Sequence, residues 1–477
     1  MIGWIILAAL CLFVIVLLVR TLMFTPKEGP RSEGESVKFD KEKVTEHMQQ
    51  LIRCKTVSYA DWSLVDEEQF SRLRALLPEF YPHVFGACTF ERVDRTAMLF
   101  HWKGKSSDAP VVLMAHYDVV PADEAAWQRP AFEALIENGE LWGRGTLDTK
   151  VTFCAALEAA EKLIADGFVP QNDIYFSFSG DEEVAGNGAP AVVQLLRSRG
   201  ITPALVVDEG GAVVQDVFPG VKGRIAMVGI AEKGMMQAQL RLKSSGGHAS
   251  APPAHSTVGR LAKAVCEIEN HPFPAKLSPP TAHMFDTLGR HSGFLMRMVF
   301  ANLWLFLPVI DLLGKKGGGE INALLRTTCA FTQMKGSDAN NVLPPAASIG
   351  ANLRLIPGET AESAIAYLKK QVSDPEIEVV DVGSMNPSPC SDVDNEGWQK
   401  LRAAIEQTWT DAVVSPYLMM ACSDSRHFCA ISDKVMRFSA MELTGEERGR
   451  IHANDERIPL EKIHKAVEFY IRLEGMC

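Results

Sequence analysis

The sequence predicts an α/β fold in which a mostly parallel sheet is flanked by helices. Two observations support this prediction. In residues 41–225, short apolar segments alternate with helical patterns, and such alternation is typical of a parallel sheet covered by helices. In residues 226–376 the pattern changes to that of a smaller α+β unit, and residues 377–477 return to the first pattern. We therefore expect a main domain, formed by the first and last segments, with a smaller domain inserted in it.

Three short apolar segments predict strands of the main domain, and each ends at polar residues. They are 109–115 before His116, 173–179 before Asp181-Glu182-Glu183, and 204–207 before Asp208-Glu209. Between the first two, residues 151–165 have the apolar stripe of a helix. Because ligands bind at the carboxyl ends of the strands in such sheets, these polar residues form the candidate site.

The same periodicities predict the remaining elements. In the inserted domain we expect helices at 258–268 and 361–372 and strands at 328–332 and 347–355, and in the last segment helices at 396–409 and 459–473. A strongly apolar segment, 298–310, is bounded by charges, contains a proline and is too short to span a membrane. We expect it to form a buried helix or hairpin. The alternative is a surface that faces lipid or binds an acyl chain.

The N-terminus differs from the rest of the chain. Ile2 to Val19 is an apolar run without a charge, closed by Arg20, and as a helix it covers about 27 Å, nearly a bilayer core. No basic residue precedes the run and no small-x-small cleavage site follows it, so we favour a transmembrane anchor at 1–24 over a cleaved signal peptide. Residues 25–40 are polar and rich in breakers, which predicts a flexible stalk. The chain is thus expected to be a single-pass membrane protein, and its few flanking charges do not fix the side.

Composition excludes some classes of protein. The chain has 477 residues, of which 47% are apolar, enough for two or three domains with real cores. Its formal net charge is -11 without a run of Lys or Arg, which argues against nucleic acid as a partner because phosphate binding needs a concentrated basic face. The ten cysteines are scattered without a Cys-x-x-Cys pair, which argues against a structural zinc ribbon or a redox pair.

Two segments of the candidate site have residue types that suit metal binding. His116 can bind a metal ion while Asp118, two residues later, holds its ring. Asp148 lies in a Gly-containing segment, GRGTLDTK, directly before the predicted helix, where a carboxylate can bridge two cations. Taken alone, a His-x-Asp is more often a strand-end His with a capping Asp, and Asp148 is as often an ordinary N-cap.

The acidic residues that follow the other two strands complete the set. Of Glu182 and Glu183, one can bind metal while the other acts as a general base. Glu209 offers a further carboxylate, and Asp208 competes with it for that role. His452 lies in a polar loop before the last predicted helix. It is a candidate metal ligand only because the chain offers the other candidate ligands.

Seven motifs in order resemble the zinc-metallopeptidase family of aminoacylase-1, acetylornithine and succinyl-diaminopimelate deacylases, and carboxypeptidase S. They are H-x-D at 116–118, GRGTLDTK, DEE at 181–183, VDEGG at 207–211, GGHAS at 246–250, NVLPP at 341–345 and RIHANDERI at 450–458. Within the family, the chain is most similar to the subgroup of vacuolar Gly-X carboxypeptidase and the N-fatty-acyl-amino-acid synthase/hydrolase. Each motif is weak alone, but seven in this order are specific, and the resemblance runs from about residue 40 to the C-terminus.

The resemblance implies a two-zinc centre. Asp148 would bridge the two ions, His116 and Glu209 would complete the site of one, and Glu183 and His452 that of the other. The mixed imidazole and carboxylate ligands suit zinc, with cobalt or manganese as substitutes.

The resemblance also implies roles for residues around the metals. Glu182 would be the general base, and Asp118 would support His116. His248 matches a small-domain histidine that helps to hold the oxyanion and, in dimeric members, reaches into the partner's site. The inserted domain would then be of a lid or dimerisation type on a zinc-exopeptidase fold, and a homodimer is compatible with it.

Three residues match positions that hold substrate or suit that role. Asn341 and Arg354 match substrate-holding positions, and Arg426 is a second candidate for binding a carboxylate, because a guanidinium binds both oxygens. The expected activity is zinc-dependent hydrolysis of an amide or peptide bond next to a free amino-acid carboxylate, with an N-acyl amino acid or a short peptide as the small-molecule substrate. The alternative is a catalytically inactive, membrane-tethered binding protein on the same fold, against which the intact ligand set argues.

Overall fold

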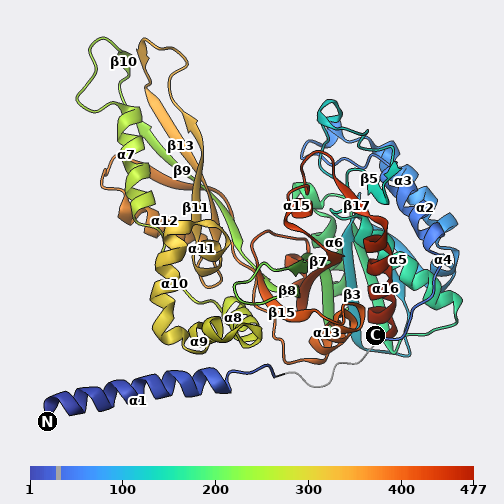
Figure 1. Ribbon diagram of the computed structural model, residues 1–477. Helices are drawn as coiled ribbons and strands as arrows, with labels where there is room; N and C mark the ends of the chain where they lie inside the picture. The colour runs from blue at the N-terminus through green and yellow to red at the C-terminus, as the bar shows by residue number, and fades with distance from the viewer. Residues whose placement is uncertain (28–33) are drawn as a thin grey trace.

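The computed structural model describes residues 1–27 and 34–477. Its centre is an eight-stranded sheet with the strand order β1-β2-β6-β3-β7-β16-β8-β15 (Figure 1). The neighbouring strands β6, β3, β7 and β16 run parallel, which confirms the predicted mostly parallel sheet. The strands are β1 (Cys88–Val93), β2 (Ala97–Trp102), β3 (Ser106–His116), β6 (Asn172–Ser179), β7 (Leu205–Gln215), β8 (Arg224–Glu232), β15 (Val413–Met419) and β16 (Val435–Glu442).

Helices cover both faces of this sheet, as alternating side chains of β3 show. Val111 and Leu113 belong to the apolar core on one face, and Val112 and Met114 to the core on the other, because successive side chains of a strand point to opposite faces. The first core lies under α2 (Lys41–Ile52), α3 (Glu67–Phe80), α4 (Pro82–Ala87), α5 (Lys150–Ala165), α13 (Glu396–Thr408) and α16 (Leu460–Gly475). The second lies under α6 (Gly188–Ser198) and α14 (Ser425–Phe428). The predicted helices at 151–165, 396–409 and 459–473 are confirmed.

A second, antiparallel sheet has the order β11-β13-β9-β14. Its strands are β9 (Gly234–Lys243), β11 (Thr328–Lys335), β13 (Ala346–Leu355) and β14 (Glu378–Met385), and the helices α7 (Thr257–Asn270) and α12 (Ala361–Gln371) pack on it. These elements include the strands and helices predicted for the inserted domain. The expected boundary at 225/226 falls inside β8 of the main sheet, and the one at 376/377 precedes β14, which still belongs to the second sheet.

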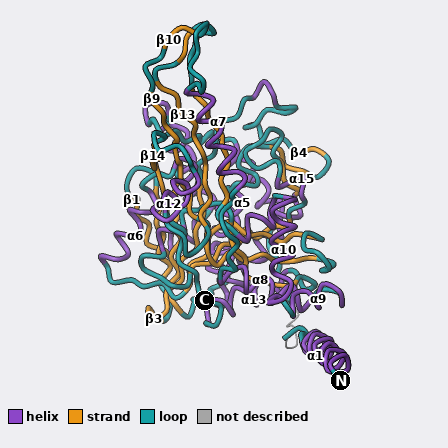
Figure 2. The backbone as a smooth tube through the Cα atoms, turned by 90° about the vertical axis from the view of Figure 1, so that its left-hand side faces the viewer, coloured by secondary structure: helices purple, strands orange, loops and turns teal. Residues whose placement is uncertain are grey.

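The second sheet extends away from the main sheet and ends in a small two-stranded ribbon. This ribbon pairs β10 (Gly247–His248) with β12 (Val342–Leu343). Figures 1 and 2 both show β10 at the tip farthest from the main sheet. The motifs at 246–250 and 341–345 therefore lie next to each other, but at a distance from the strand ends of the main domain.

Four helices below the second sheet include the apolar segment 298–310. They are α8 (Pro279–His291), α9 (Phe294–Ala301), α10 (Leu303–Gly317) and α11 (Gly319–Leu325). The segment is helical, but the prediction that it is buried is wrong. Helices α9 and α10 meet at an angle of 106°, and apolar side chains of α10 face outward, with Trp304 58% exposed. An apolar pattern indicates a surface that avoids water, but it does not tell whether the rest of the chain covers that surface.

The N-terminal helix α1 (Ile2–Met23) leaves its apolar side chains exposed. By length and composition it is a candidate membrane span or signal sequence. It lies beside α9 (Figures 1 and 2), where Arg20 donates to the carbonyl of Ala301 at 3.0 Å. Residues 28–33 of the expected stalk lie outside the described residues. On either side of them, the carbonyls of Thr25 and Glu35 accept hydrogen bonds from arginines of α8 and α16.

Candidate metal centre and active site

Four side chains surround the Asp148 carboxylate and form a two-sided cluster with it. Nε2 of His116 lies 3.0 Å from Asp148 Oδ1, and Nε2 of His452 lies 3.0 Å from Asp148 Oδ2. Glu209 Oε1 is 3.4 Å from the His116 nitrogen, and Glu183 Oε2 is 3.1 Å from the His452 nitrogen. Each imidazole thus has a glutamate of its own, and the two share the aspartate.

The parallel strands bring these residues together from distant parts of the chain. His116 is the last residue of β3, Glu183 lies in a short 3-10 helix (Glu182–Val184) after β6, and Glu209 lies in β7. Because β3 pairs with both β6 and β7 in parallel, the ends of β3 and β6 meet at one edge of the sheet beside Glu209, which follows the part of β7 that pairs with β3. Asp148 comes from the turn before α5, and His452 from the loop after α15 (Gly445–Arg448).

Asp118 lies behind His116, on the side away from Asp148. Its backbone oxygen is 3.0 Å from His116 Nδ1, and its carboxylate oxygen Oδ1 is 3.4 Å from the same nitrogen. The carboxylate also accepts the backbone N–H groups of Glu182 and Glu183, each at 3.2 Å. One buried aspartate therefore fixes the direction of the histidine ring and the position of both glutamates.

A buried carboxylate that the sequence did not single out ties the two ligand loops together. Glu456 accepts Arg144 Nη1 at 2.8 Å and the backbone N–H of Leu147 at 2.7 Å. A short antiparallel ladder joins the same segments, since β17 (Arg457–Pro459) pairs with β5 (Glu140–Trp142), which pairs with β4 (Ile136–Glu137). Arg144 and Glu456 are 312 residues apart in sequence. In the sequence, the signal for Arg144 and Glu456 is that each lies in one of the seven motifs.

The electrostatics of the cluster show an excess of negative charge. Burial works to lower the pKa of His116, but the carboxylates of Glu209, Asp118 and Asp148 raise it well above its usual value. Hydrogen bonds that its ring donates to the carboxylates of Asp148 and Glu183 raise the pKa of His452 to about 10. Burial, with the neighbouring Asp148 charge, raises the pKa of Glu209 to about 8. An environment that favours protonated imidazoles also favours bound cations.

The donor set fits divalent metal ions. Imidazole nitrogens and carboxylate oxygens are the ligand types of zinc hydrolase sites. Among the described residues, Glu183 Oε1 is buried without a hydrogen-bond partner, and such a buried oxygen requires a partner. Two groups of donor atoms lie close enough to hold an ion, His116 with Asp148 and Glu183, and His116 with Glu182 and Glu209.

Glu182 and Asp208 are the sequence neighbours of Glu183 and Glu209, and Glu182 itself belongs to one of the two donor groups. The half-buried Glu182 lies near His116 and Glu209. Burial, together with nearby carboxylates and against the effect of His116, raises its pKa well above the usual range. Asp208 is buried, and its Oδ2 accepts the backbone N–H of Ser425 at 2.9 Å. Asp208 therefore serves the packing of α14, while Glu209 faces the cluster.

The predicted substrate residues divide into two groups. His248 and Asn341 are neighbours at the tip of the second sheet, where the N–H of Ala249 donates to the Asn341 carbonyl at 2.9 Å. They do not contact the cluster of this chain (Figure 1). Arg354 of β13 contacts Cys422 Sγ at 3.8 Å, and Arg426 lies four residues further along that segment. The structure thus places both arginines beside the segment that adjoins Asp208.

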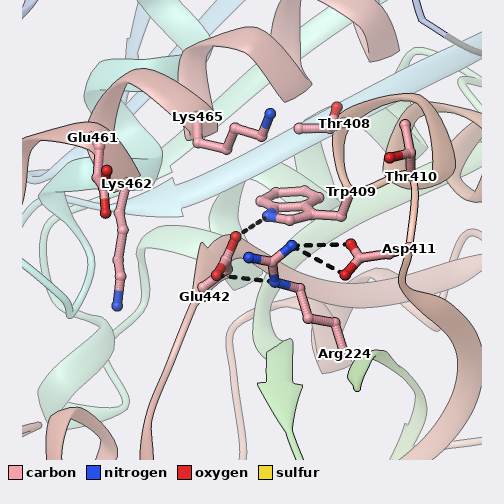
Figure 3. A pocket seen from close by; sticks show the side chains of 9 residues that line it. All are labelled: Arg224, Thr408, Trp409, Thr410, Asp411, Glu442, Glu461, Lys462 and Lys465. Atoms are coloured by element: carbon pink, nitrogen blue, oxygen red, sulfur yellow. Dashed lines mark hydrogen bonds and ion pairs between the residues drawn. The ribbon is translucent and has the colours of Figure 1, made fainter. Parts of the chain in front are cut away.

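A polar hollow of about 360 Å³ lies elsewhere on the main domain (Figure 3). Three of its charged groups pair with one another, and Lys462 and Lys465 pair with Glu447 and Glu468 outside the hollow. Arg224 is 2.9 Å from Asp411 and 3.3 Å from Glu442, and Trp409 Nε1 donates to Glu442 at 2.9 Å. None of the cluster residues lines this hollow.

Comparison with known proteins identifies the family. The model of peptidase family M20/M25/M40 matches residues 112–473. The probable carboxypeptidase S-like 2 of Dictyostelium discoideum is 32% identical over 96% of this chain and 91% of its own length. The N-fatty-acyl-amino acid synthase/hydrolase PM20D1 of Homo sapiens is 31% identical over 97% of this chain and 96% of its own length.

Solved structures share the fold at low sequence identity. The M20 family metallo-carboxypeptidase Sso-CP2 of Sulfolobus solfataricus aligns with a TM-score of 0.64 over 92% of this chain and 99% of its own, at 15% identity. The Bacillus subtilis YXEP protein, described as a dinuclear metal-binding peptidase of the M20 family, aligns with a TM-score of 0.55 over 92% of this chain and 99% of its own, at 11% identity.

Fold, cluster and relatives together define a hydrolase of the metallopeptidase class. The chain belongs to the M20 peptidase family. The resemblance predicted from the seven motifs is therefore confirmed. Membership and relatives support hydrolysis of amide bonds in small-molecule substrates.

Proposed function

We propose that this chain is a membrane-anchored, two-zinc hydrolase that cleaves the amide bond between an acyl group and an amino acid with a free carboxylate. The observation that carries the proposal is the Asp148 carboxylate placed between two imidazoles, each with its own glutamate. The similarity to proteins named N-fatty-acyl-amino acid synthase/hydrolase favours acyl amino acids over peptides. The exposed apolar α1 supports the anchor.

The cluster would bind two metal ions, one in each of its halves. His116 and Glu209 would bind one ion, Glu183 and His452 the other, and Asp148 both. Two such ions, when bound, lower the pKa of a water molecule and polarise a carbonyl group. Asp118 would keep Nε2 of His116 directed at the ion, because it occupies the Nδ1 side of the ring.

Glu182 would move the proton. Its carboxylate lies beside His116 and Glu209 and is not one of the four side chains that surround Asp148. It would accept a proton from the attacking water and deliver it to the amine nitrogen that leaves, as a general base and then a general acid. The carbons of the substrate keep their oxidation states, and water supplies the oxygen of the new carboxylate.

Arg354 is the better candidate for binding the free carboxylate of the substrate. The guanidinium of Arg426 already donates to Glu232 at 3.4 Å and to the carbonyl of Asn386, whereas the guanidinium of Arg354 contacts the sulfur of Cys422 at 3.8 Å. His248 and Asn341 would act from the second sheet of a partner copy, since their own sheet carries them away from the cluster. This part of the proposal requires a homodimer.

The rival function is a tethered binding protein without catalysis, and one experiment separates the two. The full-length chain in phosphatidylcholine nanodiscs is assayed with N-oleoyl-phenylalanine and with a Gly-Leu dipeptide, and its zinc content is measured. We expect hydrolysis of the acyl amino acid. In Glu182→Gln, turnover should fall about 10²–10⁴-fold with zinc content unchanged, whereas Glu209→Gln should lose zinc.

The outcomes distinguish the candidate functions. Cleavage of the dipeptide alone would make the chain a carboxypeptidase. Full activity of Glu182→Gln would exclude Glu182 as the base. A folded wild-type chain without zinc or activity would favour the binding protein.

A further inference from the structure

A cavity of about 300 Å³ lies between β15, at the edge of the main sheet, and the helices α8–α11. Its wall is apolar, with Phe285 of α8, Phe300 of α9, Leu313 of α10 and Leu324 of α11 among the lining residues. Among the described lining residues, only Glu320 carries a charge, and it pairs with Arg448 at 3.2 Å. Such walls offer water few hydrogen-bond partners and favour an apolar occupant.

One side of the cavity adjoins the segments that carry the cluster. Met420 lines the cavity. The preceding residue, Met419, packs against Gly210, and a Cβ added at Gly210 would lie 2.6 Å from the Met419 sulfur. Gly210 directly follows Glu209. Arg448 is the last residue of α15 and pairs with Glu320 of the cavity wall. The loop that follows α15 carries His452, which belongs to the other half of the cluster. Each half of the cluster is therefore connected to the cavity wall through an intermediate residue, Met419 next to Met420 or Arg448 paired with Glu320.

The opposite side opens on the exposed apolar face of α10 and α11. Leu313 and Ile321 line the cavity and are nevertheless 62% and 43% exposed, so the opening lies between these two helices. The same helix α10 carries Trp304, whose ring lies against that of Phe13 of α1 with 6.1 Å between centroids. With α1 in a membrane, this face lies at the surface of the bilayer.

We propose that this cavity binds the hydrocarbon chain of a long-chain N-acyl amino acid, which enters between α10 and α11 from the lipid. The inference rests on the proposed function and deepens it, because it assigns the acyl half of the substrate to a site of its own. The polar half would then lie at the cluster and the arginines, and the apolar half among the methionine, leucine and phenylalanine side chains. Each methylene moved from water into such a site raises kcat/KM up to about fourfold.

The test compares acyl chain lengths in matched variants. Rates are measured for N-acetyl-, N-octanoyl-, N-lauroyl- and N-oleoyl-phenylalanine with the full-length chain in phosphatidylcholine nanodiscs. Leu313→Trp narrows the opening, and Leu312→Trp is the control, since Leu312 is also exposed on α10 but is outside the cavity wall. Leu324→Trp narrows the buried part, and its activity on the acetyl substrate reports that it folds.

We expect Leu313→Trp and Leu324→Trp to lower kcat/KM for the oleoyl substrate by at least about tenfold, the loss of two or more methylene contacts. The acetyl substrate should change by no more than about twofold, as should all substrates with the control variant. Losses that are equal for all chain lengths, or no loss in either variant, would overturn the inference and leave the proposed function standing. A wild-type chain that cleaves none of the four substrates would overturn both.

Discussion

Glu456 is predicted to hold the two ligand loops, which carry Asp148 and His452, in register, and its replacement tests this. Its carboxylate accepts Arg144 Nη1 at 2.8 Å and the backbone N–H groups of Gly145 and Leu147 at 3.0 and 2.7 Å. Arg144 in turn donates to the carbonyl of His452 at 3.3 Å. The loop before α5 and the loop before α16 are thus fastened to one buried ion pair.

Glu456→Gln keeps the shape of the side chain but removes its charge. It leaves a buried guanidinium without its counter-ion, and breaking such a pair costs about 3–5 kcal/mol. The new amide also turns a donor toward a backbone N–H, and a buried N–H without an acceptor costs about 1–3 kcal/mol. Because these costs overlap, we expect the free energy of unfolding to fall by about 3–5 kcal/mol. Zinc affinity should fall about 10–100-fold, since the ligand loops lose their common support.

Two measurements check this prediction on the full-length chain. Urea unfolding of the metal-free protein gives the stability, and competition with a chromogenic chelator gives the zinc affinity. The control is Glu446→Gln, because Glu446 is 77% exposed and pairs with Arg450 on the same segment. The control should differ from wild type by no more than about 1 kcal/mol. A Glu456→Gln protein as stable as the control, with wild-type zinc affinity, would refute the reasoning.

Three further changes have defined outcomes. Asp118→Asn turns a donor toward the backbone N–H groups of Glu182 and Glu183 and should lower zinc affinity about 10–100-fold in the chelator assay; wild-type affinity would exclude a supporting role. Gly211→Ala places a Cβ 1.8 Å from the carbonyl oxygen of Met227, so β7 must move, at a cost of about 1–3 kcal/mol; an unchanged melting temperature would contradict this. The buried Glu474 has no hydrogen-bond partner among the described residues for either oxygen, and burial raises its pKa well above the usual range. At acid pH both states hold the proton, but as pH rises the unfolded state releases it first, so this group makes the wild type less stable with rising pH. Glu474→Gln does not ionise, and its stability relative to wild type should therefore increase between about pH 5 and about pH 8; a constant difference in urea unfolding would contradict the assignment.

The elements of the main domain were predictable because their signals are local. The apolar segment 109–115 became β3, and the stripe in 151–165 became α5, since side-chain periodicity is set within a few residues. The rule that parallel strands present their carboxyl ends at one edge then placed His116, Glu183 and Glu209 together.

Other parts of the site depend on contacts that spacing does not encode. Glu456 and Arg144 pair across 312 residues, and neither residue type marks a buried ion pair in a sequence. The motif at 246–250 identified the place of His248 in the family pattern. The distance of His248 from the cluster follows from the direction in which the second sheet extends, which the motif does not encode. The same limit explains the wrong prediction for 298–310, because apolar composition does not say what covers a helix.

The zinc content of the purified full-length chain tests the central claim, that Asp148 and the four side chains around it form a metal centre. We predict about two zinc ions per wild-type chain, and fewer than about one in Asp148→Ala, because both halves share this carboxylate. Circular dichroism would show that both proteins are folded. A folded wild-type chain that binds neither zinc nor cobalt nor manganese, or a zinc content that Asp148→Ala leaves unchanged, would contradict the account.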